Sequence, residues 1–258
     1  MTAHATSSST STATTRTLLV TLTGEPFQPV RLYYSIPNKV AATRIFLVLR
    51  CMVEADAGAW HWQYEHEAGA LKFARPRDEL PEEVHPIILG RFHFAAKDRM
   101  VLAVRSGERA IEAAKFFAQM FGEKIVLRRL RVINRYLDAS EREAGLDGLD
   151  RLLDANVVRI DPKDAEDEIN AATAGARTLE EKQRAFSAHC EERRKRDLPL
   201  VEDLPLHPEE ETPDFQHLMM TIRLRSIRAF QHWKGHKLTL GDVIHQVIES
   251  GTVGLPGE

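Results

Sequence analysis

Residues Met100–Tyr136 decide the fold, and they read MVLAVRSGERAIEAAKFFAQMFGEKIVLRRLRVINRY. The start of this stretch, up to Arg105, is rich in Val and Leu and predicts a strand. Ser106 then precedes apolar residues at helical spacing and Gly122 follows them, so we expect a helix between these two residues. Apolar residues from Ile125 onward indicate a second strand. The stretch therefore predicts a βαβ unit, whose connection we expect to be right-handed.

Patterns before this unit extend it into a larger α+β domain. A long apolar run at 40–53 predicts a helix. Apolar or alternating segments predict strands at 17–23, 29–36, 58–66, 87–94 and 99–105. We expect residues 17–137 to form a mixed sheet of about six strands, with two helices packed on one face.

The composition differs on both sides of this domain. Residues 1–16 are rich in Ser and Thr and predict a disordered tail. Residues 138–213 predict a charged helical region, with a capping box at Ser140–Glu143 and a later helix capped by Thr178–Glu181, that ends in a linker rich in Pro and acidic residues. Residues 214–258 predict a C-terminal helical hairpin. The expected fold is thus α+β, followed by an all-α C-terminal region.

The totals exclude several classes of protein. The 258 residues have a net charge of −3, so any attraction to nucleic acid must come from local basic clusters. Cys51 and Cys190 lie far apart in the sequence, and a disulfide framework is not expected. No apolar run reaches the roughly 18 residues of a membrane span, and the first residues lack the apolar core of a secretory signal. We therefore expect a cytoplasmic protein without membrane contact.

Three groups of residues are candidates for nucleic-acid binding. The first is the aromatic strand, in which Trp60, Trp62 and Tyr64 alternate and share one face. Aromatic side chains on a sheet face can stack with bases. Packing of the same side chains in the core, beneath a helix, is the more frequent arrangement.

The second group is formed by four arginines in or near the last predicted strand: Arg128, Arg129, Arg131 and Arg135. Arg129, Arg131 and Arg135 have the same strand parity, so they would line one face if the strand continues. A row of guanidinium groups suits phosphates or an acidic partner. An edge strand that is protected from aggregation by its charge is the alternative interpretation.

The third group belongs to the helix predicted after residue 213. Arg225, Arg228 and His232 are spaced to share a face, with Arg223 and Lys234 beside them. The helix, a turn and a short capped helix loosely resemble a helix-turn-helix, although the turn is longer than usual. A basic helix face that is simply solvated would give the same pattern.

Signatures of catalysis, metals and cofactors are missing from the sequence. It has no Gly-rich phosphate loop, no Gly-x-Ser-x-Gly and no His-Glu-x-x-His. We expect no catalytic residues, no metal site and no cofactor. An acidic group near the aromatic strand keeps a metal-dependent nuclease or hydrolase as an alternative, and its members are Glu54, Asp56, Glu65 and Glu67.

These observations favour a non-enzymatic subunit of a larger assembly that contacts nucleic acid through local arginine clusters. The hypothesis requires arginines from distant parts of the chain to gather on one solvent-facing surface. A protein-binding adaptor without nucleic-acid contact is the main alternative, because the charged helices expected in 138–213 could pair with a protein partner.

Overall fold

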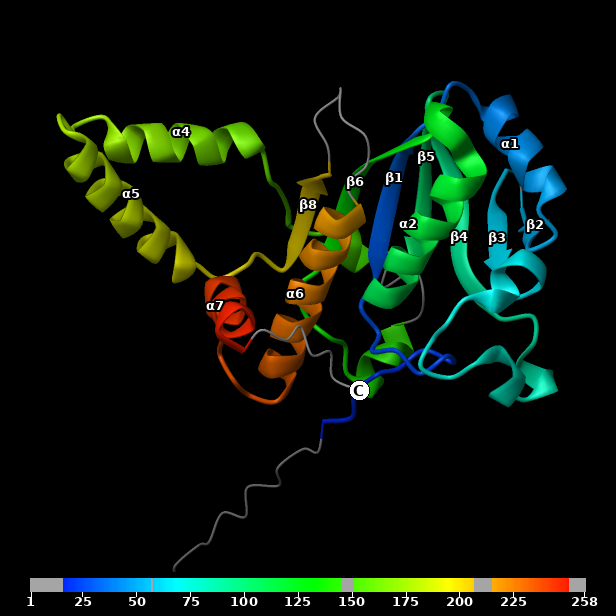
Figure 1. Cartoon of the computed structure of the whole chain (residues 1–258). Coiled ribbons are helices and arrows are strands. Elements are labelled where there is room, and N and C mark those ends of the chain that lie inside the picture. Colours follow the sequence, from blue (N-terminus) through cyan, green and yellow to red (C-terminus); the bar gives the residue numbers. More distant parts are fainter. Residues whose placement is uncertain (1–15, 57, 145–150, 207–214, 251–258) are drawn as a thin grey trace, which may run out of the picture.

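One mixed sheet of eight strands forms the centre of the structure, a computed structural model that describes residues 16–56, 58–144, 151–206 and 215–250 (Figure 1). The strands are β1 (Val30–Ser35), β2 (Met52–Glu54), β3 (Trp60–Gln63), β4 (Ile88–Ala96), β5 (Arg99–Val104), β6 (Val126–Ile133), β7 (Val157–Arg159) and β8 (Val201–Pro205). Their order in the sheet is β2-β3-β4-β5-β1-β6-β8-β7, and all neighbours are antiparallel except β7 and β8. The predicted tail at 1–15 lies outside the described residues.

The predicted βαβ unit is present with one strand inserted. Helix α2 (Gly107–Phe121) connects β5 to β6, and at its start the Ser106 Oγ accepts a hydrogen bond from the Arg109 N–H at 3.1 Å. Gly122 follows the helix with a φ of +61°, a conformation that glycine adopts without steric cost. Since β5 and β6 both pair antiparallel with β1, they run parallel to each other on either side of it.

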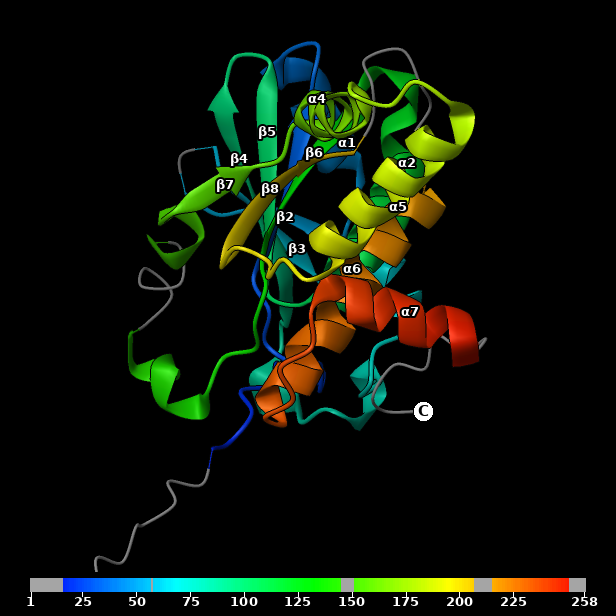
Figure 2. The same cartoon turned by 90° about the vertical axis from the view of Figure 1, so that its left-hand side faces the viewer.

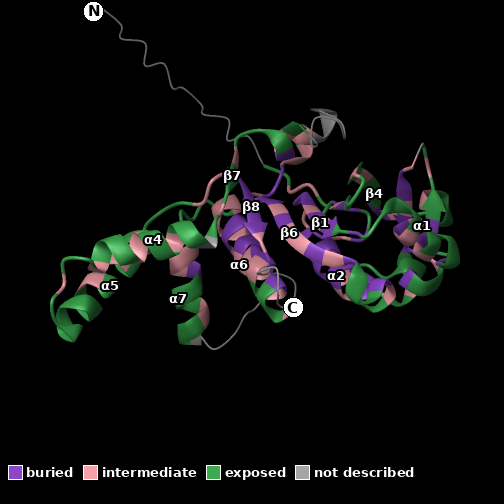
Figure 3. Ribbon diagram, turned by 90° about the horizontal axis from the view of Figure 1, so that it is seen from above, coloured by how far each residue is buried: buried purple, intermediate pink, exposed green. Residues whose placement is uncertain are grey.

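Three helices cover one face of the sheet: α1 (Lys39–Val48), α2 and α6 (Phe215–Trp233) (Figure 3). Aromatic rings fill the space between them and the strands, and Phe92 lies 4.9 Å from Phe46 and 4.8 Å from Phe117 between ring centroids. α2 approaches α6 closely at Gly107, where a Cβ atom would lie 2.8 Å from Ile222 Cγ2. The main hydrophobic core is therefore on this face.

The sheet has more strands than the sequence predicted, and the additional strands come from two different parts of the chain. β2 comes from the end of the run at 40–53, which was predicted as one helix, whereas α1 stops at Val48. β7 and β8 come from the segment 138–213, which was predicted to be helical and linker, and they join the sheet of the preceding domain. The predicted strand at 17–23 forms only isolated bridges. β2 and β7 have three residues each, too few for an alternating pattern to be recognised.

β8 was missed for a different physical reason. Its sequence is VEDLP, and acidic residues beside proline are typical of an exposed linker. In the structure Glu202 and Asp203 are nevertheless buried, because arginines of other elements pair with them. A strand stabilised by ion pairs does not show the apolar pattern on which strand prediction depends.

The helices predicted from residue 161 onward are confirmed. The helix predicted to start at Ser140 instead begins as a 3-10 helix (Ala139–Ala144), and residues 145–150 lie outside the described part of the chain. α4 (Pro162–Thr173) and α5 (Leu179–Arg194) form a hairpin that extends away from the sheet beyond β8 (Figure 1). The capping box between Thr178 and Glu181 is formed at the start of α5. α7 (Leu240–Ser250) packs against the end of α5, where Arg194 Nε lies 3.2 Å from Asp242 Oδ1 (Figure 2).

Candidate nucleic-acid interface

Two rows of side chains cross the sheet face opposite α1, α2 and α6, and together they define the open face. In the first row, directly paired residues connect all eight strands, and from β2 to β7 they are Val53, His61, Arg91, Ala103, Arg31, Arg131, Asp203 and Arg159. The second row, from β4 to β6, consists of His93, Val101, Tyr33 and Arg129. Because paired residues point to the same side of a sheet, guanidinium groups from four strands share this surface.

A network of ion pairs joins the arginines in the middle of the open face. Asp154, in the helical turn at 151–154, accepts hydrogen bonds at Oδ1 from Arg31 Nη1 at 2.6 Å and from Arg131 Nη1 at 2.7 Å. Asp203 accepts from Arg131 Nη2 at 2.9 Å and from Arg129 Nε at 2.9 Å. Two carboxylates thus hold three guanidinium groups side by side.

Tyr33 provides an aromatic ring within this network. The guanidinium carbon of Arg129 lies 5.4 Å from the centroid of the Tyr33 ring, and that of Arg131 lies 5.3 Å from it. At these distances the ring quadrupole attracts the cations, which fixes the orientation of all three side chains. Tyr33 is only half-buried, so part of its surface faces solvent.

The arginines of the open face come from four strands. The five arginines are Arg31, Arg91, Arg129, Arg131 and Arg159. Within the described residues, Asp154 and Asp203 pair with the central three, and Asp56 lies 3.9 Å from Arg91. The side chain of Arg91 is 54% exposed, and Arg159 is exposed as well.

The arginines predicted around the last strand of the βαβ unit occupy different surroundings. Arg129 and Arg131 share the open face, as their parity predicted. Arg128 lies at the point where the pairing of β1 and β6 shifts register, and it is in neither row. Arg135 follows the end of β6, where its two terminal nitrogens donate to Glu141 at 2.9 and 2.6 Å. The predicted row of guanidinium groups is thus only partly formed.

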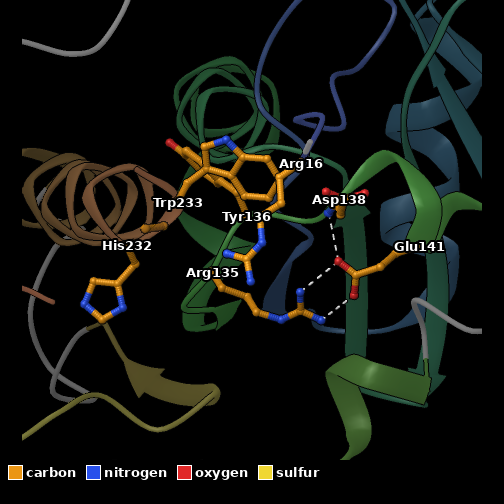
Figure 4. Close-up of a pocket in the computed structure, with 8 residues that line it drawn as sticks. Arg16, Arg135, Tyr136, Asp138, Glu141, His232 and Trp233 are labelled. Carbon is orange, nitrogen blue, oxygen red and sulfur yellow. Dashed lines mark hydrogen bonds and ion pairs between the residues drawn. The ribbon is translucent and has the colours of Figure 1, made fainter. Parts of the chain in front are cut away.

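Arg135 lines a separate pocket of about 310 Å³ near the end of α6 (Figure 4). The same pocket contains Trp233, over which the Arg16 guanidinium lies at 6.0 Å from the ring centroid. The hydrogen bond from Arg135 lowers the pKa of Glu141, and hydrogen bonds from Ser140 lower that of Asp138. Two arginines and two carboxylates balance each other here, so this pocket has no surplus of positive charge.

The prediction that α6 presents its arginines to a nucleic acid is not supported, because two of them point into the protein. Arg225 is buried and donates to Glu202 of β8 at 2.8 Å from its Nε. Arg228 is buried and pairs with Asp197, and it also donates to the Asn134 carbonyl at 3.2 Å. These partners precede or belong to β8, which the sequence did not reveal as a strand.

The two remaining basic residues of the helix region are more accessible. Arg223 lines a pocket of about 180 Å³ between α2 and α6, together with Glu108. Burial raises the pKa of Glu108, and the nearby Glu25 carboxylate adds to the effect. Lys234 is exposed at the end of α6, with its Nζ 4.2 Å from the Phe230 ring centroid. The basic face expected on this helix is therefore not formed.

The aromatic strand belongs to the core. Trp60, Trp62 and Tyr64 are buried, with 3%, 0% and 1% of their surface exposed. The Trp62 ring packs 5.2 Å from that of Phe117 in α2, between centroids. In the folded protein these side chains have no face available for a base, so their alternation reflects packing beneath helices. The burial of these side chains therefore contradicts the prediction that bases stack on them.

Three of the four acidic residues considered for a hydrolase make other contacts. Glu67 accepts from the backbone N–H groups of Arg50 and Cys51 at 3.2 and 2.9 Å. Glu65 lies 3.3 Å from Arg77, and Asp56 lies near Arg91. In the described parts of the chain, no group of three or more His, Cys, Asp or Glu side chains is placed to hold a metal ion.

Several residues of the open face escaped the sequence analysis: Arg31, Tyr33, Arg91, Asp154, Arg159 and Asp203. Arg31 and Tyr33 alternate within a correctly predicted strand, and this parity was the available signal. Arg91, Arg159 and Asp203 join them only through strand pairing, and Asp154 only through the packing of its helical turn; the sequence of one strand contains neither.

Comparison of the chain with protein-family models, with curated proteins and with solved structures gave no match in any of the three. The described residues form an α+β protein built on one mixed sheet of eight strands. Among the described helices, none combines the length and the apolar composition that a bilayer span requires.

Proposed function

We propose that the protein binds single-stranded nucleic acid on the open face, as a non-enzymatic subunit of a larger assembly. The observation that supports this proposal best is the cross-strand row, which brings Arg31, Arg91, Arg131 and Arg159 onto one surface. Eight strands at about 4.8 Å spacing give this row a length of about 33 Å. Such a row can follow the phosphates of an extended strand.

The aromatic ring between the arginines favours a single strand over a duplex. Tyr33 lies in the second row with its ring held by Arg129 and Arg131. A base that is not paired can stack on such a ring, and the flanking guanidinium groups can contact the phosphates next to it. In a duplex the bases are stacked on each other and do not offer their faces.

The proposal is tested by fluorescence anisotropy with labelled oligo-dT, oligo-U and a DNA duplex, titrated with salt. We expect both single strands to bind more tightly than the duplex. The double variant Arg91→Ala/Arg159→Ala should weaken binding and reduce the slope of log K against log salt by about 1.4, since each phosphate contact of a single strand contributes about 0.7.

Arg184→Ala provides the matched control, because Arg184 is an exposed arginine of α5, and this helix belongs to the hairpin that extends away from the sheet (Figure 1). It should leave affinity and salt slope unchanged. An affinity that depends neither on salt nor on Arg91 and Arg159 would count against the proposal.

A protein-binding adaptor remains the second candidate, and the α4–α5 hairpin favours it. No described residue of α5 is buried, while Leu179 and Phe186 expose 72% and 45% of their surface. Isolated helices are marginal in water without packing of an apolar face. If this hairpin binds a protein partner, Phe186→Ser should abolish a pull-down that resists nuclease treatment. Loss of the pull-down on nuclease treatment would favour the first candidate.

A further inference from the structure

We infer that Arg31 and Arg131 form a subsite for a backbone phosphate of the nucleic acid, and that Asp154 occupies this subsite in the free protein. The inference rests on the proposed function and specifies where a phosphate binds and what it displaces. Asp154 Oδ1 lies between Arg31 Nη1 at 2.6 Å and Arg131 Nη1 at 2.7 Å. One anionic oxygen shared by two guanidinium groups is also the arrangement in which arginines hold a phosphate oxygen.

Contacts other than the one with Asp154 hold Arg131 in place, and strand pairing sets the positions of both arginines. They are directly paired residues of β1 and β6, and their side chains are 11% and 17% exposed. Arg131 also donates to Asp203 at 2.9 Å and lies 5.3 Å from the ring centroid of Tyr33. Removal of Asp154 therefore leaves the donor nitrogens of Arg131 oriented, and a ligand gains from this existing order.

Asp154 is the carboxylate that can leave. Its side chain is 57% exposed, whereas that of Asp203 is only 2% exposed. The helical turn at 151–154 is anchored by Leu153, which is buried against Ile133 and Val201. A rotation of the Asp154 side chain toward solvent does not disturb this anchor. Solvent screens the exposed side of this carboxylate, which weakens its attraction to the two guanidinium groups.

Displacement of Asp154 changes the charge of the centre of the open face. Arg31 and Arg131 then lose the carboxylate oxygen that they share, while Asp203 stays beside Arg129 and Arg131. A phosphodiester restores the balance, and its neighbouring base lies within reach of the Tyr33 ring. Asp154 thus lowers the affinity of the free protein for weak anions and is replaced by a strand that makes further contacts along the row.

The decisive comparison is between Asp154→Asn and Asp56→Asn. Both substitutions remove one exposed carboxylate from an arginine of the open face, but Asp56 lies 3.9 Å from a single guanidinium group. We expect Asp154→Asn to bind oligo-dT and oligo-U about tenfold more tightly than the wild type, which corresponds to removal of one competing charge contact. The effect of Asp56→Asn should stay below about threefold, as expected for a screened surface charge.

Inorganic pyrophosphate is a second probe that does not depend on base stacking, and its binding is measured by titration calorimetry. Asp154→Asn should bind it about tenfold more tightly than the wild type. The double variant Asp154→Asn/Arg31→Ala should lose this gain, while circular dichroism checks that both variants remain folded. A gain that survives the loss of Arg31, or equal effects of Asp154→Asn and Asp56→Asn, would overturn the subsite.

The two probes separate the subsite from the function. If pyrophosphate binds the Asp154→Asn variant as expected but neither oligonucleotide binds the wild type, the subsite is supported and the proposed function is overturned. If the oligonucleotides bind the wild type and Asp154→Asn changes neither probe, the proposed function is supported and the subsite is overturned.

Discussion

Glu202 and Asp203 are adjacent in β8, both are buried, and they point to opposite faces of the sheet. Glu202 lies beneath α6 and pairs with Arg225, whose side chain is only 9% exposed. Asp203 lies on the open face and pairs with Arg129, whose side chain is 30% exposed. The covered pair is sealed inside the protein, whereas the open pair has one side in water. The same kind of ion pair is therefore inaccessible to solvent on one face and reachable from solvent on the other.

The largest effect that separates the two faces is expected from Arg225→Ala. This substitution leaves Glu202 buried without its cationic partner, which typically costs about 3–5 kcal/mol. Urea unfolding followed by circular dichroism measures the loss of free energy of unfolding. Arg129→Ala is the counterpart on the open face and should cost less than about 1.5 kcal/mol, because solvent and Arg131 remain near Asp203. Equal costs on the two faces would contradict the comparison.

A smaller effect is expected at the contact between α2 and α6, on the sheet face that these helices cover. Gly107→Ala places a Cβ atom 2.8 Å from Ile222 Cγ2, so α2 and α6 must separate slightly, at a cost of about 1–3 kcal/mol. Ala103→Ser adds a single atom to a half-buried residue of the open face and serves as the control. It should change stability by less than about 0.5 kcal/mol. Thermal unfolding of the two variants measures both changes in stability.

The smallest of these effects concerns Glu108, in the pocket between α2 and α6. Because burial raises its pKa, the folded protein binds a proton at Glu108 more readily than the unfolded chain does. The stability from this group is complete below the unfolded pKa and is lost as the pH rises through the folded pKa. Glu108→Gln stays neutral, so it should raise the melting temperature at pH 8 relative to wild type and give no advantage at pH 4.

Glu112→Gln is the matched control for this pH dependence, since Glu112 lines the same pocket and pairs with Lys115 at 3.0 Å. Scanning calorimetry at both pH values should show no stabilisation by Glu112→Gln. A Glu108→Gln variant that is less stable than wild type at pH 8 would contradict the stated effect of burial.

The same contrast explains how much of the fold the sequence could predict. The βαβ unit, the capping residues Ser106 and Thr178 and the alternation of Trp60 and Trp62 depend on local spacing, and the structure contains all of them. β8 could not be predicted, because its acidic residues are buried only through ion pairs with arginines that are distant in sequence. The local sequence pattern indicated an exposed linker, whereas pairing with distant arginines makes this segment a buried strand.

The sequence predicted only part of the candidate surface, because the rest depends on contacts between distant segments. Arg129 and Arg131 were placed on one face from their parity, and the structure agrees. Arg225 was placed on a solvated face, because helical spacing gives the relative position of side chains but not which side is buried. Arg31 and Arg91 join the surface only through the register of β1, β4 and β5, which depends on the folded sheet.

Photo-crosslinking tests most directly whether nucleic acid binds the open face. The wild-type protein is crosslinked to an oligonucleotide that contains 5-iodouracil, and the attached peptides are identified by mass spectrometry. If single-stranded nucleic acid binds the open face, the crosslink maps to Tyr33 in β1, and excess unlabelled oligo-dT suppresses it. Crosslinks confined to Trp233 and Lys234 at the end of α6, with none at Tyr33, would contradict the account.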